Sequence, residues 1–133
     1  MKDIKLPFQI GEQYEIWEFD LEVLAADKIR GYDSYYYTKD IYFNGLKPAR
    51  AELIFGLDVL EAVILSFEPP EISYTLRKTL LMKREEIFNL SSIQTADIPQ
   101  KIVICIMKST KFAHLLYGKK PIISQLINNL RNP

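Results

Sequence analysis

The side chains with the most reactive chemistry in this chain are one cysteine and one histidine. Cys105 lies inside the apolar run from Ile102 to Met107, and His114 follows shortly after it. If the two segments form a hairpin, the thiol and the imidazole could meet as a nucleophile and its base. A thiol in an apolar strand is more often an inert buried group, and a lone histidine with one cysteine lacks the ligands for zinc. We therefore predict neither a catalytic residue nor a metal site.

Three carboxylates offer a second possibility for chemistry, because they alternate with apolar residues between Trp17 and Val23. In a strand they would share one face about 7 Å apart, a spacing that acid–base enzymes use. Such a row becomes catalytic only in a concave and perturbed environment, so a solvated sheet face is the commoner outcome. The strand would place Trp17, Phe19, Leu21 and Val23 on the core face and Glu18, Asp20 and Glu22 on the other.

Motifs for phosphate and nucleic-acid binding are absent. The glycines are isolated, and no Gly-x-Gly or Gly-Lys-Ser/Thr cluster occurs, so no nucleotide cofactor is predicted. Residues 98–133 contain six bases and no acid, but these bases are thinly spread and lack interleaved aromatic residues. This pattern argues against a nucleic-acid partner.

The formal net charge of zero conceals two poles. Residues 10–40 hold eight acids and three bases, a net charge of −5, whereas residues 98–133 carry +6. The two ends of the chain could lie close together and compensate each other. The neutral sum itself gives no general attraction to nucleic acid or to anionic lipid.

Four tyrosines fall within six residues just after the acidic segment. Tyrosine offers a stiff contact area with a polar end and is enriched at interfaces, where neighbouring acids would suit a basic protein partner. The alternative is that the rings are half-buried sheet residues favoured by their β propensity. The candidate protein-binding residues are Glu18, Asp20, Glu22, Tyr32, Asp33, Tyr35, Tyr36 and Tyr37.

The pattern of elements predicts one α+β domain over residues 1–133, with an antiparallel sheet of about 5–7 strands. Helical periodicity predicts one long helix at about 71–88 and a C-terminal helix at about 121–131. Residues 111–117 fit a strand or a helical turn, and their alternation favours the strand. Further strands are expected at 17–23, 35–37, 41–43, 51–55, 60–67 and 102–107, and a connection at 91–100.

Cellular location follows from what the sequence lacks. The first residues contain no secretory signal, and no apolar run approaches the ~18 residues of a membrane span. A single cysteine excludes an intramolecular disulfide. We expect a cytoplasmic protein.

Three segments together resemble the small immunity proteins with which bacteria neutralise toxins, such as those of contact-dependent inhibition systems. They are the acidic segment Trp17–Val23, residues 31–35, and the hairpin Ala51–Phe67 followed by a helix. The resemblance implies a cytoplasmic inhibitor that covers a toxin's active site or another essential surface. Nuclease inhibitors are often strongly acidic, and here only the N-terminal third could present such charge.

These observations favour a non-enzymatic domain that binds another protein, with a basic toxin domain as the most concrete partner. A domain that binds a small ligand or catalyses a reaction on an open sheet face is the alternative. A homodimer that pairs through a strand edge or a tyrosine-bearing face is a third interpretation.

Overall fold

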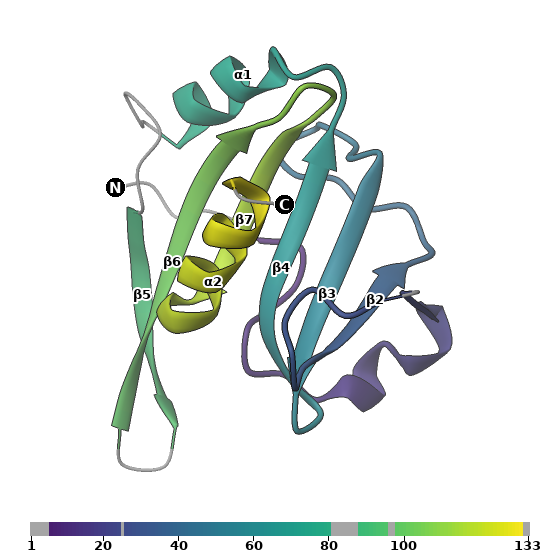
Figure 1. Cartoon of the computed structure of the whole chain (residues 1–133), viewed down its shortest axis with the longest axis vertical. Helices are drawn as coiled ribbons and strands as arrows, with labels where there is room; N and C mark the ends of the chain where they lie inside the picture. The colour runs from purple at the N-terminus through teal and green to yellow at the C-terminus, as the bar shows by residue number, and fades with distance from the viewer. Residues whose placement is uncertain (1–5, 25, 81–87, 96–97, 132–133) are drawn as a thin grey trace.

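A computed structural model describes residues 6–24, 26–80, 88–95 and 98–131 of the chain. These residues form a seven-stranded sheet in the order β1-β2-β3-β4-β7-β6-β5, with every strand pair antiparallel (Figure 1). This is the α+β class that the sequence predicts. The elements are the 3₁₀ turns η1 (Tyr14–Ile16) and η2 (Glu18–Asp20), the strands β1 (Leu21–Val23), β2 (Asp33–Tyr37), β3 (Arg50–Gly56), β4 (Val59–Phe67), β5 (Phe88–Thr95), β6 (Ile98–Lys108) and β7 (Ala113–Lys119), and the helices α1 (Ile72–Thr79) and α2 (Lys120–Arg131). Neither helix in these ranges combines the length and apolarity needed to cross a membrane.

The β3–β4 hairpin forms the centre of the sheet, as its two apolar runs predict. Its turn consists of Leu57 and Asp58, which both have positive φ angles (51° and 65°). Two successive residues of this kind give a turn whose twist matches that of the flanking strands. Glycine normally supplies such angles, so the adjacent Gly56 marked the correct region of the chain but not the turn residues themselves.

The two sides of the sheet carry separate cores, because successive residues of a strand point to opposite faces. On one side, Ile54, Ile64 and Leu116 are buried beneath α2, and we call this the α2 face. Figure 1 shows α2 lying in front of the sheet on this side. Both faces of the central strands are buried, which explains why these strands read as nearly continuous apolar runs.

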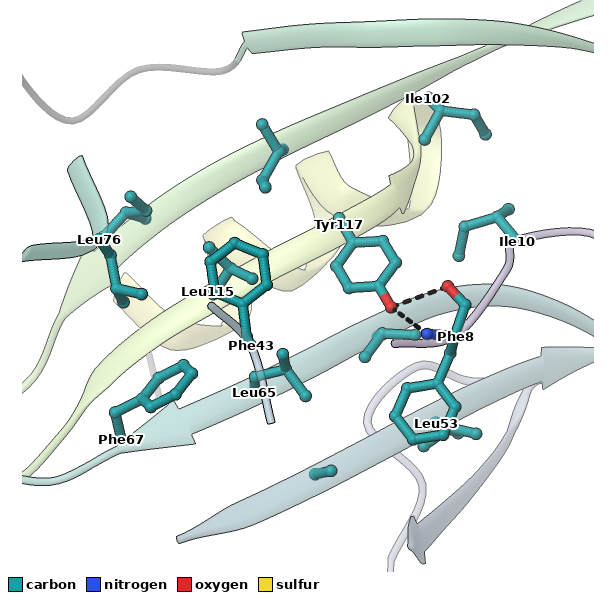
Figure 2. Packing of buried hydrophobic residues seen from close by; sticks show 14 of the residues in the cluster. Phe8, Ile10, Phe43, Leu53, Leu65, Phe67, Leu76, Ile102, Leu115 and Tyr117 are labelled. Atoms are coloured by element: carbon teal, nitrogen blue, oxygen red, sulfur yellow. Dashed lines mark hydrogen bonds between the residues drawn. The ribbon is translucent and has the colours of Figure 1, made fainter. Parts of the chain in front are cut away.

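The other side, which we call the aromatic face, is closed by the N-terminal segment, the loop at residues 41–46 and α1. Tyr117 of β7 is fully buried there, and its hydroxyl donates to the carbonyl of Phe8 (2.8 Å) and accepts from the Phe8 N–H (3.0 Å; Figure 2). The burial raises the pKa of the Tyr117 hydroxyl. This pair of bonds satisfies two backbone groups that would otherwise be buried without partners.

Within the segment at residues 111–117, residues 113–117 belong to strand β7, as the alternation favours, and residues 111–112 are in the preceding turn. β7 pairs with β4 on one side and β6 on the other, and the chain then passes directly into α2, which confirms the predicted C-terminal helix. Gly118 makes this junction possible, since its φ is +151° and a Cβ there would contact the carbonyl oxygen of Glu61 and lie 2.7 Å from Ala62 Cα.

The prediction of one long helix at 71–88 was wrong in its extent. α1 ends at Thr79, where the N–H of Leu80 donates to the Leu76 carbonyl, and Phe88 already belongs to β5. Residues 81–87 lie outside the described part. Within the described residues, the expected connection at 91–100 forms most of β5 and the start of β6. An edge strand buries less of its surface than a central one, so polar residues are compatible with it and conceal it in the sequence.

The strand predicted at residues 41–43 is also absent. Phe43 instead forms an isolated bridge with Leu46 across a tight turn at Asn44 and Gly45, which have positive φ angles of 51° and 81°. The Asn-Gly pair thus makes the turn that its composition indicates. The Phe43 side chain is buried in the core of the aromatic face, so the loop serves as a plug rather than as a strand (Figure 2).

Candidate protein-binding surface

The acidic N-terminal segment does not form the continuous strand predicted at residues 17–23. It contains two consecutive 3₁₀ turns, and only Leu21–Val23 pair with β2. The N–H of Trp17 donates to the carbonyl of Tyr14 (3.0 Å), and the N–H of Asp20 donates to the carbonyl of Trp17 (2.8 Å). These i to i+3 bonds replace the ladder that an extended strand would need.

A 3₁₀ helix has three residues per turn, so residues three apart share one side. Tyr14 and Trp17 therefore point inward, and both pack against the core of the aromatic face. Ile16 and Phe19 point outward, with 56% and 93% of their surfaces exposed. The expectation that Phe19 belongs to the core was wrong for this reason, and Val23 is also mainly exposed (72%).

The adjacent hairpin and aromatic residues hold this segment in place. Gln13 forms a bridge with Val59 of β4, and the Tyr14 N–H donates to the carbonyl of Asp58 (2.7 Å). The Trp17 ring lies edge-on to Phe8 with centroids 5.7 Å apart. The inward residues are thus tied to the hairpin and to the core, and this geometry positions the outward residues.

The acids of the segment divide into exposed and paired groups. Glu18 and Glu22 are exposed. Asp20 is only partly exposed, its carboxylate lies 3.9 Å from Lys39 Nζ, and its carbonyl accepts from the Thr38 N–H and Oγ1. Glu18, Asp20 and Glu22 therefore do not form one row. We define the acidic apolar surface as the exposed side chains of the two 3₁₀ turns: Glu15, Ile16, Glu18 and Phe19. Glu22 and Val23 are exposed too, but as neighbours in β1 they point to opposite faces of the sheet.

Two of the four clustered tyrosines are half-buried members of the aromatic face. Tyr37 lies edge-on to Phe8 (centroids 4.9 Å apart), and Tyr35 lies edge-on to Phe55 (5.7 Å) and near Tyr14 (5.3 Å). Burial raises the pKa of both tyrosines, and neighbouring Tyr14 and Asp33 add to the shift at Tyr35. Packing against aromatic rings is their main structural role.

The remaining predicted residues lie elsewhere. Tyr32 packs against the core of the α2 face and covers Gly56, whereas Asp33 is exposed at the start of β2. Tyr36 is partly exposed on the α2 face, where the Arg50 guanidinium carbon lies 5.8 Å from its ring centre. The eight predicted residues therefore do not form a single cluster, and their part in binding stays a prediction.

A buried charged cluster on the α2 face was not anticipated from the sequence. Glu52 is 2% exposed, with Lys28 Nζ at 3.5 Å and Arg50 Nε at 3.9 Å from its Oε1. Neither that oxygen nor Arg50 Nε has a hydrogen-bond partner among the described residues. Arg50 also lies between the rings of Tyr36 and Phe112, with 5.2 Å from its guanidinium carbon to the centre of Phe112. A glutamate inside an otherwise apolar strand was the only sequence signal for this cluster.

Next to this cluster, Ser66 and His114 form a buried pair, with 2.9 Å between Oγ and Nδ1. Burial, together with the positive charges of Arg50 and Lys28, lowers the pKa of His114 to about 4. The imidazole is neutral at pH 7 and covered. The pair can therefore tie β4 to β7, but neither group is presented to a substrate.

The other chemical possibilities gain little from the geometry. The β6–β7 register places Met107 opposite His114, and Cys105 opposite Leu116. No group of three metal-binding side chains gathers within the described ranges. Over β3, β4 and β7, both faces of the sheet are buried by other described residues. The alternative of a ligand or catalytic site on an open sheet face therefore finds no open face at these strands.

Comparison with known protein families, with curated proteins and with solved structures finds no match for this chain.

Proposed function

We propose that the chain is a non-enzymatic protein-binding module whose acidic apolar surface captures a basic protein. Phe19 is the observation that carries this proposal. Its ring is 93% exposed on a segment that otherwise packs its aromatic residues inward. Ile16 lies on the same side of the 3₁₀ turns, and Glu15 and Glu18 flank both residues.

The apolar part of this surface would supply the affinity. Burial of a phenylalanine side chain contributes about 1.5–3 kcal/mol, which is the range of an interface hot spot. A hot spot needs a large anchor surrounded by groups that exclude water. Phe19 would be the anchor, and Ile16, Glu15 and Glu18 would be the surrounding groups. The rigid tethering of Tyr14 and Trp17 lowers the entropy that binding would cost.

The acidic part of the surface would select the partner. No basic residue occurs between Leu6 and Leu24, so the segment presents negative charge without internal compensation. Such a field accelerates encounter with a basic surface and disfavours acidic proteins. The most concrete form of the proposal is a cytoplasmic immunity protein that neutralises a basic toxin domain by direct binding. The resemblance to bacterial immunity proteins supports this form.

If the chain is an immunity protein, we expect its toxin to be encoded immediately upstream. The proposal is therefore tested with the protein encoded there, co-expressed and purified with this chain. We expect a complex whose affinity falls by about 30-fold in Phe19→Ser, equivalent to about 2 kcal/mol. Tyr42→Ser is the matched control, because Tyr42 is also an exposed aromatic residue but lies outside the surface. Equal affinity for the two variants, or no complex with the wild-type chain, would contradict the proposal.

The electrostatic part is tested separately with Glu18→Lys. We expect this change to slow association with the same partner, and the difference from wild type to shrink as salt concentration rises. Glu68→Lys makes the same change of charge at an exposed position outside the surface and serves as the control. A Glu18→Lys variant that associates at the wild-type rate in low salt would remove the steering role.

A further inference from the structure

A second exposed surface of opposite charge lies at the α1 end of the molecule. Tyr74 of α1 is 63% exposed, and two cations lie against its ring. The Arg77 guanidinium carbon is 5.8 Å from the ring centre, and Lys108 Nζ is 5.4 Å from it. We define the basic aromatic patch as Tyr74, Arg77, Lys78, Lys108 and Lys111.

Two elements distant in sequence build this patch. Arg77 and Lys78 come from the last turn of α1, whereas Lys108 ends β6 and Lys111 lies in the β6–β7 turn. Lys111 Nζ also lies 5.4 Å from the centre of the Phe112 ring. Cations held over aromatic rings keep a defined position while the ring edges stay accessible. The patch thus suits a partner surface that offers carboxylates together with an apolar or aromatic group.

The chain itself carries a surface with that composition. In the acidic apolar surface, Phe19 and Ile16 are exposed beside Glu15 and Glu18. Figure 1 shows α1 and the β6–β7 turn at one end of the sheet, with η1 and η2 toward the other. The two surfaces cannot meet within one molecule, but they can meet between two. The zero net charge of the chain thus includes one acidic and one basic surface that lie apart.

We propose that the acidic apolar surface of one copy binds the basic aromatic patch of a second copy. The contact is head-to-tail, so an open assembly keeps one free acidic apolar surface at one end and one free basic aromatic patch at the other. Its small apolar area and exposed charges place it among weak, salt-sensitive interfaces. A basic protein partner competes for the same acidic surface, so its binding shortens the assembly.

This inference uses the surface named under the proposed function, but its test requires no other protein. Sedimentation velocity of the full chain at increasing concentrations is compared at about 0.02 M and about 0.5 M salt. We expect the average mass to rise with concentration at low salt and to return to the monomer value at high salt. A monomer at every concentration in low salt would overturn self-association and leave the heterotypic proposal standing.

Charge reversal identifies the two surfaces. Glu18→Lys and Lys108→Glu should each weaken self-association by at least tenfold when studied alone. An equimolar mixture should restore association, because the first variant retains the basic patch and the second retains the acidic surface. Tyr74→Ser should weaken association without changing charge, and Lys47→Glu should leave it unchanged. Association that survives both charge reversals, or a mixture no more associated than its components, would overturn the head-to-tail contact.

Discussion

The inward and outward sides of the two N-terminal 3₁₀ turns differ in burial, although their residues alternate within one short segment. Trp17 packs against Phe8 and near Phe55, whereas Phe19 points to solvent only two residues later. The same 3₁₀ geometry produces both environments, because it returns to the same side every third residue. The inward side secures the fold, and the outward side offers an apolar ring that none of the described residues covers. The aromatic residues of one segment thus divide into those that stabilise the fold and one that we propose to bind a partner.

The largest effect should come from the inward side. We expect Trp17→Ala to lower the free energy of unfolding by about 3 kcal/mol, since it removes a large ring from the aromatic cluster and leaves a cavity. Urea unfolding followed by far-UV circular dichroism measures this loss. Tryptophan fluorescence cannot be used, because Trp17 is the only tryptophan of the chain and the variant lacks it. Trp17→Phe should retain most of the stability. A loss below about 0.5 kcal/mol in Trp17→Ala would mean that the segment is not secured as described.

The charged cluster on the α2 face should make stability depend on pH. The His114 pKa is about 4 in the folded chain, against 6.5 ordinarily, so the unfolded chain takes up a proton first as the pH falls. The free energy of unfolding should therefore decrease by about 2 kcal/mol between pH 7 and pH 5.

His114→Gln is the control for this effect. The variant should lose the pH dependence of the free energy of unfolding in that window. The same slope in wild type and variant would show that His114 is not held neutral by its surroundings.

A smaller effect should follow from loss of the hydroxyl that ties Phe8 to β7. We expect Tyr117→Phe to cost about 1.5 kcal/mol, since the N–H and carbonyl of Phe8 then lose a buried partner. Hydrogen exchange of the Phe8 amide gives a local readout, and its protection should fall more than that of β4 amides. Unchanged protection of Phe8 would contradict this role of Tyr117.

The smallest effect on stability should come from the outward side. Phe19→Ser should change the free energy of unfolding by less than about 0.5 kcal/mol, because the described residues leave 93% of this side chain exposed. The same urea unfolding measurement as for Trp17→Ala applies. A loss comparable with that of Trp17→Ala would show that Phe19 is a structural residue and would remove the distinction between the two sides.

Sequence patterns predicted the elements that bury continuous apolar runs. β3, β4, β7 and α2 follow from local apolar periodicity and turn residues, because burial and secondary structure agree there. The alternation at residues 17–23 misled because most of this segment has no strand partner: β2 pairs only with its last three residues. β5 escaped prediction because β6, rather than its own composition, determines its pairing.

The candidate surface was predicted in part. Glu18 is exposed, as its charge indicates, but of the two apolar anchors Phe19 was expected in the core and Ile16 was not singled out. The local sequence does not distinguish the two-residue period of a strand from the three-residue period of a 3₁₀ helix. The long-range pairing of Gln13 with Val59, just before the 3₁₀ turns, is a contact that local patterns cannot reveal.

We propose that the acidic apolar surface binds a basic protein. NMR mapping of backbone amides during titration with the co-purified upstream gene product tests this proposal most directly. We expect the largest shifts at Ile16 and Phe19, with small shifts at Tyr35 and Tyr37 on the buried side. Shifts concentrated on other surfaces, with residues 15–19 unchanged, would contradict the account.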